Sequence, residues 1–273
     1  MNNNNLRWLA GAAVLVLALS LGASAQTPDD CSDPNSILNS TYGWQLEGRF
    51  EAGVSANAAD APLVSVGYFT FDGNGNFSGA HDTNLAGRLV PHSDFGTYTV
   101  NPDCTTGTIS RTSGAGFIMA IVIVGSGEEI KFVGVNGVAY GTLRRMAAAP
   151  CSASTLAGKS YGYATHGLMG SGAPDAFPRI GGFVPFTNAG LISFQSDGNV
   201  SGMDNLNLGG VFMPGQSIAG TYSVNPDCTG TTTLTIGGVG HSWNFVILEG
   251  GEEVFFIATP SGLVWAGTLT AIN

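Results

Sequence analysis

The sequence predicts an all-β protein built as two tandem antiparallel up-and-down barrels of about eight strands each. A composition typical of strands and turns, apolar residues at every second position and a long internal repeat lead to this expectation. Of the 273 residues, 41 are Gly and only 10% are charged, as in chains rich in β-hairpins. Two β-sandwiches are the alternative architecture.

The internal repeat divides the chain into two copies. GTYTVNPDC at 96–104 returns as GTYSVNPDC at 220–228, and further blocks match in the same order. These blocks are LNSTYGW with LAGKSYGY, VGYFTFDGNGNFSG with AGLISFQSDGNVSG, VIVGSGEEIKFVG with VILEGGEEVFFIA, and GVAYGTL with GLVWAGTL. Blocks that match in register indicate a duplicated domain. We expect a first barrel at 26–145, a linker at 146–150 and a second barrel at 151–273.

Within each copy, alternation indicates the strands, and Asn, Asp and Gly indicate the turns. Tyr42, Trp44 and Leu46 share one face of the first strand, and Phe69 and Phe71 alternate in the second. The connections at one end are short and suit hairpin turns: DGNG, NPDCTTG and GSGEE. The connections at the other end are expected to be long: 51–62, 80–94, 167–188 and 203–219. Each barrel should therefore have a tight end and a loop-rich end, and loops often carry function.

The first 25 residues have the pattern of a secretory signal peptide. Arg7 precedes an apolar run at 8–21, and Ala23-Ser24-Ala25 supplies the small residues that a signal peptidase requires. The run is short for a bilayer span of about 20 residues. We expect cleavage after Ala25, a secreted or periplasmic protein, and no membrane span in the mature chain.

The charge balance restricts the partners of the protein. A net charge of −10 and a pI near 4.5 disfavour nucleic acids and anionic membranes, because both repel an acidic surface. No nucleic-acid partner is therefore expected.

The four cysteines are expected to form one disulfide in each barrel. Cys31 and Cys151 precede the first strand of each copy, while Cys104 and Cys228 lie in the NPDC turns at the same, tight end. The duplication and the topology therefore both favour the pairs Cys31–Cys104 and Cys151–Cys228. No CxxC motif occurs and no His lies at ligand spacing from these cysteines, so no metal site is expected.

Motifs that carry chemistry are few. The segment Asp72-Gly-Asn74-Gly-Asn76 begins like a calcium loop, but Phe77 and Thr83 occupy the positions that require Gly and Glu. A hairpin turn is favoured there. The paired carboxylates after Gly-rich turns are expected on solvated hairpins: Glu128-Glu129 and Glu252-Glu253. The histidines belong to no catalytic motif and are expected in loops or at the surface: His81, His92, His166 and His241. Catalytic residues stay unknown, and no cofactor is expected.

Two apolar features suggest contacts. The strand FIMAIVIV (Phe117–Val124) is apolar on both faces, so its outer face is expected to be covered by the other barrel or by another subunit. WNFVILEGG and EVFFIA are similarly apolar. The loop-rich end of the second barrel carries side chains that either bind an apolar small molecule or seal the barrel: Met169, Phe177, Phe183, Phe186, Phe212 and Met213, with His166 beside them.

The blocks TFDGNGNFSG, GTYTVNPDC and EEIKFVG resemble a family of exported bacterial proteins of unknown function with duplicated β-barrel domains. The eight-strand plan is also similar to the calycin-like barrel of allene oxide cyclases and dirigent proteins. That likeness implies an apolar lumen that encloses reactive lipid or phenolic intermediates. No functional residue of those relatives matches a position of this sequence.

The favoured function is that of an exported, non-catalytic protein that binds an apolar small molecule or a surface component. An isomerase- or cyclase-like enzyme acting on a lipid or phenolic substrate in a barrel lumen is the alternative. A purely structural protein with filled barrels is the third hypothesis. An enzyme should have a carboxylate or His that points into a cavity, so buried ionisable groups distinguish these readings.

Overall fold

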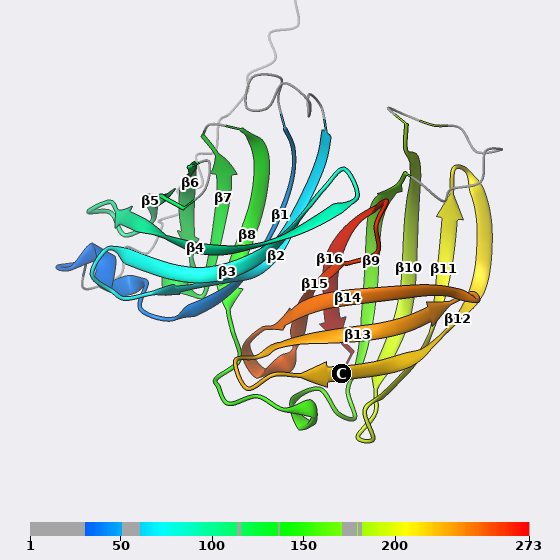
Figure 1. The fold of residues 1–273 in the computed structure, drawn as a ribbon. Helices are drawn as coiled ribbons and strands as arrows, with labels where there is room; N and C mark the ends of the chain where they lie inside the picture. The colour runs from blue at the N-terminus through cyan, green and yellow to red at the C-terminus, as the bar shows by residue number, and fades with distance from the viewer. Residues whose placement is uncertain are drawn as a thin grey trace, which may run out of the picture.

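The computed structural model describes residues 31–50, 61–113, 116–135, 137–170, 179 and 182–272. It confirms two closed antiparallel barrels of eight strands each (Figure 1). The first contains β1 Thr41–Phe50, β2 Ala61–Phe71, β3 Asn76–Leu85, β4 Arg88–Val100, β5 Thr106–Arg111, β6 Phe117–Val124, β7 Glu129–Gly134 and β8 Val138–Arg145. The second contains β9 Ser160–Met169, β10 Val184–Phe194, β11 Asn199–Leu208, β12 Val211–Val224, β13 Thr229–Ile236, β14 Val239–Ile247, β15 Glu253–Ala258 and β16 Leu263–Ala271.

Each strand pairs with the next one along the chain, and closure joins β1 to β8 and β9 to β16. Short 3-10 turns η1 Pro34–Ile37, η2 Gly125–Gly127, η3 Ala153–Thr155 and η4 Glu249–Gly251 lie between or before strands. In the described residues, no helix is long and apolar enough to span a membrane.

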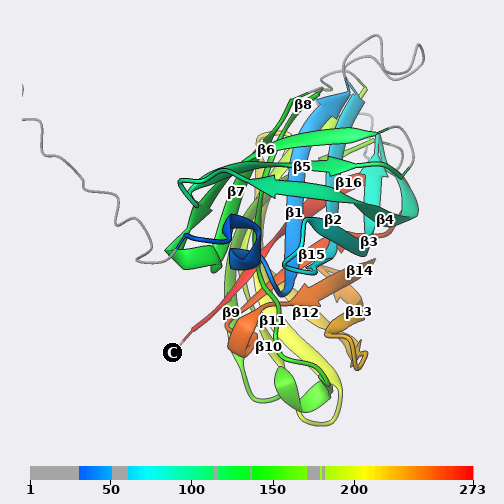
Figure 2. The same ribbon diagram turned by 90° about the vertical axis from the view of Figure 1, so that its left-hand side faces the viewer.

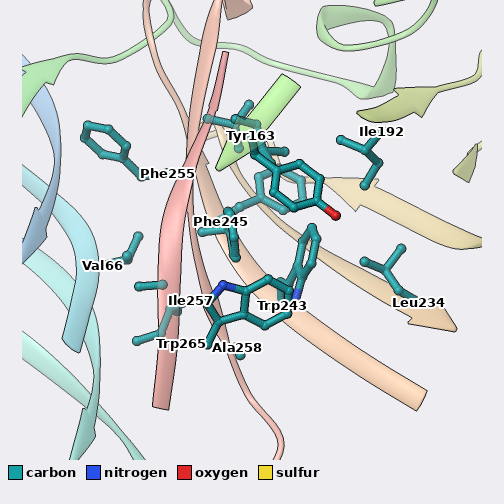
Figure 3. Close-up of a cluster of buried hydrophobic side chains, with 14 of the residues drawn as sticks. Val66, Tyr163, Ile192, Leu234, Trp243, Phe245, Phe255, Ile257, Ala258 and Trp265 are labelled. Atoms are coloured by element: carbon teal, nitrogen blue, oxygen red, sulfur yellow. The ribbon is translucent and has the colours of Figure 1, made fainter. Parts of the chain in front are cut away.

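Aromatic side chains fill much of each lumen. In the first barrel the ring of Phe71 lies 5.5 Å from Tyr42 and 5.0 Å from Tyr98, centroid to centroid. In the second, Trp243 stacks on Phe256 at 4.3 Å and meets Trp265 edge-on at 5.2 Å (Figure 3). These interiors are packed by their own side chains, as small barrels commonly are.

Tyrosine hydroxyls close the tight end of the first barrel. Tyr42 Oη donates to the Gly127 carbonyl at 2.6 Å, and Tyr98 Oη donates to the Leu38 carbonyl at 2.9 Å. Leu38, which follows η1, has no exposed surface.

The second barrel repeats this arrangement at its own tight end. Tyr161 Oη donates to Gly251 at 2.6 Å, and Tyr222 Oη donates to Gln195 at 2.8 Å. Leu156 takes the place of Leu38 and is likewise fully buried.

The disulfides join Cys31 to Cys104 and Cys151 to Cys228, which confirms the pairing expected from the repeat. Both bridges tie the entry to a barrel to its NPDC turn. Cys104 and Cys228 adopt positive φ angles of 53° and 65°, which are uncommon for residues other than Gly.

Two of the expected long loops are instead strands joined by two-residue turns, so the prediction of loops at 80–94 and 203–219 was wrong. The β3–β4 hairpin turns at Ala86-Gly87 and the β11–β12 hairpin at Gly209-Gly210, with positive φ at all four residues. The 167–188 connection is also shorter than expected, because β9 extends to Met169 and β10 begins at Val184. Residues 51–60 lie outside the described residues.

The two barrels contact each other through the outer faces of different strands. The β14–β16 wall of the second barrel packs on β1–β3 of the first. Val66 meets the side of the second barrel that bears Phe255 and Ile257, whereas Tyr163 and Trp243 lie on the lumen side (Figure 3). The dense segments WNFVILEGG and EVFFIA therefore form the contact between the barrels.

The expected contact between barrels through Phe117–Val124 was wrong. Outward residues of β6 are exposed instead, with Val122 at 50% and Val124 at 43%. In Figure 2 strands β5–β7 face the viewer, on the side of the first barrel away from β14–β16. Whether another subunit covers them stays a prediction.

Hydrogen bonds between polar groups fix the position of one barrel relative to the other. Asn84, fully buried, donates through Nδ2 to the Leu263 carbonyl at 2.6 Å and accepts at Oδ1 from Gly87 N at 3.0 Å. Gly87 O accepts from Gly262 N at 2.8 Å. A Cβ on Gly87 would lie 2.6 Å from Gly262 Cα, so only Gly permits this approach.

An ion pair at the tight ends joins the two copies of the Glu-Glu motif. Arg144 of β8 binds Glu253 of β15 and, at 3.0 Å, Glu129 of β7. Burial alone would raise the pKa of Glu129, but its hydrogen bonds from Lys131 and Arg144 and their charges lower it instead. These carboxylates thus serve the junction as ion-pair partners.

Candidate functional site

The lumen of the first barrel contains a buried polar cluster that the sequence analysis did not anticipate. The β3–β4 hairpin places His81 beside Asp94, and β5 contributes Arg111 from the other side. Asp94 binds His81 Nδ1 through Oδ2 and accepts at Oδ1 from Arg111 Nη1 at 3.3 Å and Ser113 Oγ at 3.2 Å. The His92 ring stacks on His81 with centroids 4.7 Å apart.

Ion pairing keeps Asp94 ionised despite its burial. Burial by itself would raise the pKa of Asp94, but the His81 hydrogen bond and the charges of His81 and Arg111 outweigh it and hold the pKa below its usual value. The pKa of His92 is lowered, first by partial burial and then by the charges of His81 and Arg111.

Near this cluster, two nitrogen donors have no partner among the residues that the structure describes. Trp44 Nε1 and Arg111 Nε are buried without a hydrogen bond, and the Trp44 ring lies 5.0 Å from His81. Buried donors without partners cost about 1–3 kcal/mol each, so such sites commonly hold ordered water. The His81 side chain is only 1% exposed, so the cluster holds β3, β4 and β5 together rather than offering an open base.

The second barrel carries a different polar layer at the equivalent height. Asp204 occupies the position that matches His81, and Tyr163 matches Trp44 in the repeat. Tyr163 Oη donates to Asp204 Oδ1 at 2.9 Å, and Asn188 Nδ2 donates to Oδ2 at 3.4 Å. Because burial dominates, the pKa of Asp204 is raised, as is that of Tyr163.

On the opposite wall of this lumen, three polar atoms are buried without a partner in the described part of the chain. They are Thr232 Oγ1, His241 Nδ1 and Trp243 Nε1. Burial lowers the pKa of His241. The two lumens thus differ in charge: the first contains a paired carboxylate, and the second contains a carboxylate that accepts from the neutral side chains of Tyr163 and Asn188.

The raised pKa of Asp204 predicts a stability change with pH. The folded state holds the proton more tightly than the unfolded state, so Asp204 opposes folding increasingly as pH rises from the ordinary Asp pKa through the folded pKa. Between those values the penalty changes by about 1.4 kcal/mol per pH unit.

Urea unfolding from pH 7 to pH 4 checks this. The wild type should gain stability relative to Asp204→Asn as pH falls, since the variant has no carboxyl group there. A difference between the two proteins that stays constant with pH would contradict the prediction.

The residues expected to line the second mouth divide into two sets. Phe186 is buried and meets Trp265 edge-on at 5.6 Å, while Met169, Phe183 and Met213 pack partly against the same core. Phe212 is 62% exposed, and His166 lies on the outer face of β9, with its Nε2 3.3 Å from Glu47. Phe177 lies outside the described residues. Ligand binding at these positions stays a prediction.

Clefts occur at the junction of the barrels. One of about 330 Å³ is bordered by Tyr68, His92, Asn225, Asp227 and Asn244. Another of about 410 Å³ is bordered by Glu47, Lys131, Tyr140, His166 and Thr268. Among the described residues, no three His, Cys, Asp or Glu side chains gather as a metal ion would require.

A group of exposed apolar side chains lies on the outer wall of the first barrel. Its members, here called the β6–β8 face, are outward residues of three adjacent strands with exposures of 43–59%: Val122, Val124, Val133, Val138 and Tyr140. Register places Val133 between Ala120 on β6 and Tyr140 on β8, whereas the β7 residues opposite Val122 and Val124 are the ion-paired Lys131 and Glu129. The β6–β8 face thus combines exposed apolar side chains with one ion pair.

Fold and site together define a duplicated, disulfide-bonded eight-stranded barrel protein with filled lumens and an exposed apolar wall. No family model and no curated protein matches the chain.

Among solved structures, the chain is similar to transferrin binding protein B from Neisseria meningitidis, at 8% identity over 85% of this chain and 76% of that one, with a TM-score of 0.32. Transferrin binding protein B from Haemophilus parasuis matches at 8% over 85% and 75%, with a TM-score of 0.28. A DUF3598-family protein of unknown function from Nostoc punctiforme matches at 10% over 88% and 97%, with a TM-score of 0.21. Likeness at these scores carries no argument about function.

Proposed function

We propose that this chain is an exported, non-catalytic binding protein whose working surface is the β6–β8 face. The exposure of Val133 at 55%, at the centre of an apolar wall, carries the proposal. Covering these side chains with a partner would be favourable, because burying each methylene group contributes about 0.8 kcal/mol of free energy. The partner is therefore a macromolecular surface component with an apolar patch of its own.

The packing of the lumens favours this surface over an internal ligand site. Several core side chains of the first barrel are at most 4% exposed, namely Phe69, Phe71, Phe77 and Met119. The second barrel is filled by Trp243, Phe256 and Trp265. An apolar small molecule would have to displace these rings. Two disulfides support an extracytoplasmic location, where such bridges persist.

One observation favours the enzyme alternative, namely the buried pair of His81 and Asp94 in the first lumen. Such a pair can move protons. However, His81 Nδ1 binds Asp94 and its Nε2 lies 3.4 Å from Arg111 Nη1, so both ring nitrogens are occupied. Binding through the outer wall therefore remains the favoured function.

Site-specific photo-crosslinking in the producing cells tests the proposal. A benzophenone amino acid at Val133 should yield an adduct of defined mass, because the partner covers this side chain. The control position is Val239, which is 58% exposed at the β13–β14 hairpin of the second barrel and should give no such adduct. Equal labelling at both positions, or none at Val133, would overturn the proposal.

A further inference from the structure

The contact between the two barrels is heterologous, because β14–β16 of one copy packs on β1–β3 of the other. Duplication gives every residue of this contact a counterpart in the other copy. The counterpart of the β14–β16 wall is β6–β8 of the first barrel, and the counterpart of β1–β3 is β9–β11 of the second. Within the described residues, the intrachain contact reaches these counterpart faces at their edges, through Arg144 of β8 with Glu253 and His166 of β9 with Glu47.

The β6–β8 face keeps the apolar character of the wall that is buried within the chain. Val122 and Val124 match Val246 and Leu248, which are 3% and 2% exposed. In the next two strands, the same correspondence holds between further pairs: Val133 with Ile257, Val138 with Val264, and Tyr140 with Ala266. The second-copy members are 0–3% exposed, whereas the first-copy members are 54–59% exposed.

The β9–β11 face retains a turn equivalent to the Asn84–Gly87 turn, which hydrogen-bonds to the second barrel within the chain. Asn207-Leu208-Gly209-Gly210 matches Asn84-Leu85-Ala86-Gly87. Asn207 Oδ1 accepts from Gly210 N at 2.9 Å, as Asn84 Oδ1 does from Gly87 N. The Asn84 amide then donates to the β15–β16 turn, whereas the structure gives Asn207 Nδ2 no acceptor among the described residues.

Space and apolar surface are also present on this face. A Cβ on Gly210 would meet nothing within 4 Å, while the same atom on Gly87 would strike the Gly262 turn. Leu191 and Met203 are register partners on β10 and β11 and are 43% and 54% exposed. They match Tyr68 and Ala80, the first of which packs against the second barrel.

From this correspondence we propose that one copy of the chain binds another head to tail, with the β6–β8 face of one on the β9–β11 face of the next. The proposal rests on the proposed function and names its partner as a second copy. Lys131 stands where Phe255 packs within the chain, and Ile272 lies beside Gly162, so this contact is weaker than the intrachain one. Heterologous contacts leave one face of each kind open at the ends and build rings or chains.

Sedimentation velocity of the chain beginning at Gln26 tests the proposal. The wild type should form species larger than one chain as its concentration rises. Val133→Lys and Leu191→Lys each bury an ammonium group in the contact and should raise the concentration for half-assembly by about a hundredfold. Val239→Lys, at the β13–β14 hairpin, should assemble like the wild type.

Mixing the two defective variants separates head-to-tail assembly from other arrangements. Val133→Lys retains an intact β9–β11 face and Leu191→Lys retains an intact β6–β8 face, so the mixture should form a one-to-one dimer and stop there. A Leu191→Lys protein that still dimerises alone would show a symmetric contact and overturn the proposal. A wild type that stays monomeric would also overturn it, while a Val133 crosslink to a different protein would leave the proposed function standing.

Discussion

Replacing Asp94 with Ala is expected to destabilise the protein by about 3 kcal/mol, because it breaks a buried ion pair and leaves its partners without their acceptor. His81 and Arg111 both lose their contact with the carboxylate, and Ser113 loses its acceptor. Unfolding in urea, followed by the fluorescence of nearby Trp44, measures the change.

The matched control is Asp82→Ala, on the outer face of the neighbouring strand β3. Asp82 accepts from Asn244 at 2.7 Å across the contact between the barrels, and its loss should cost about 1 kcal/mol. Equal effects of the two substitutions would contradict the assignment of a buried ion pair to Asp94.

Acid should remove the Asp94 contribution. Because the pKa of Asp94 is lowered in the folded state, its stabilisation is complete above the ordinary Asp pKa and is lost as pH falls through the folded pKa. Asp204 has the opposite sign, so the two carboxylates oppose each other under acid conditions.

Removing the second disulfide is expected to have a similarly large effect. The double variant Cys151→Ala/Cys228→Ala opens a loop with a sequence separation of 77 residues, which the chain-entropy model values at about 4 kcal/mol. The corresponding Cys31→Ala/Cys104→Ala variant opens a separation of 73 residues and should lose about as much. Denaturation under non-reducing conditions compares both variants with the wild type.

A Gly at the turn provides the internal check. Cys228 has a φ of 65°, so Ala there retains a left-handed conformation that Gly adopts at lower cost. Cys151→Ala/Cys228→Gly should therefore be about 1 kcal/mol more stable than the double Ala variant. A Gly variant less stable than the Ala variant would show that the backbone relaxes once the bridge is absent.

The repeat made the barrels and their disulfides predictable. GTYTVNPDC and its copy fix a strand, a turn and a cysteine at equal places in each half, and alternation of Tyr98 with Val100 gives the strand its inner face. The positive φ of both cysteines could not be anticipated, because no Gly or Asn occupies those positions.

The β3–β4 hairpin escaped prediction because both faces of its strands carry polar residues. His81 and Asp94 point into the lumen, while Asp82 and Asn84 face the second barrel, so no apolar alternation marks them. A signal was nevertheless present: NLAG at 84–87 and NLGG at 207–210 repeat the same turn.

Runs of apolar residues identified strands whose outer faces could form contacts. They did not indicate which of these faces is buried between the two barrels. The outer faces of β6 and β14 have matching apolar patterns, yet Val246 is buried by the first barrel and Val122 is exposed. Which face of a duplicated unit meets its sister depends on the path of residues 146–159 between the copies, which the strand pattern does not encode.

The tyrosines and leucines at the tight ends seal each lumen on that side. Tyr42 and Leu38 block one end of the first lumen, and Tyr161 and Leu156 block the matching end of the second. Solvent therefore does not reach the Trp243 indole or the Asp204 carboxylate through the tight end of the second barrel.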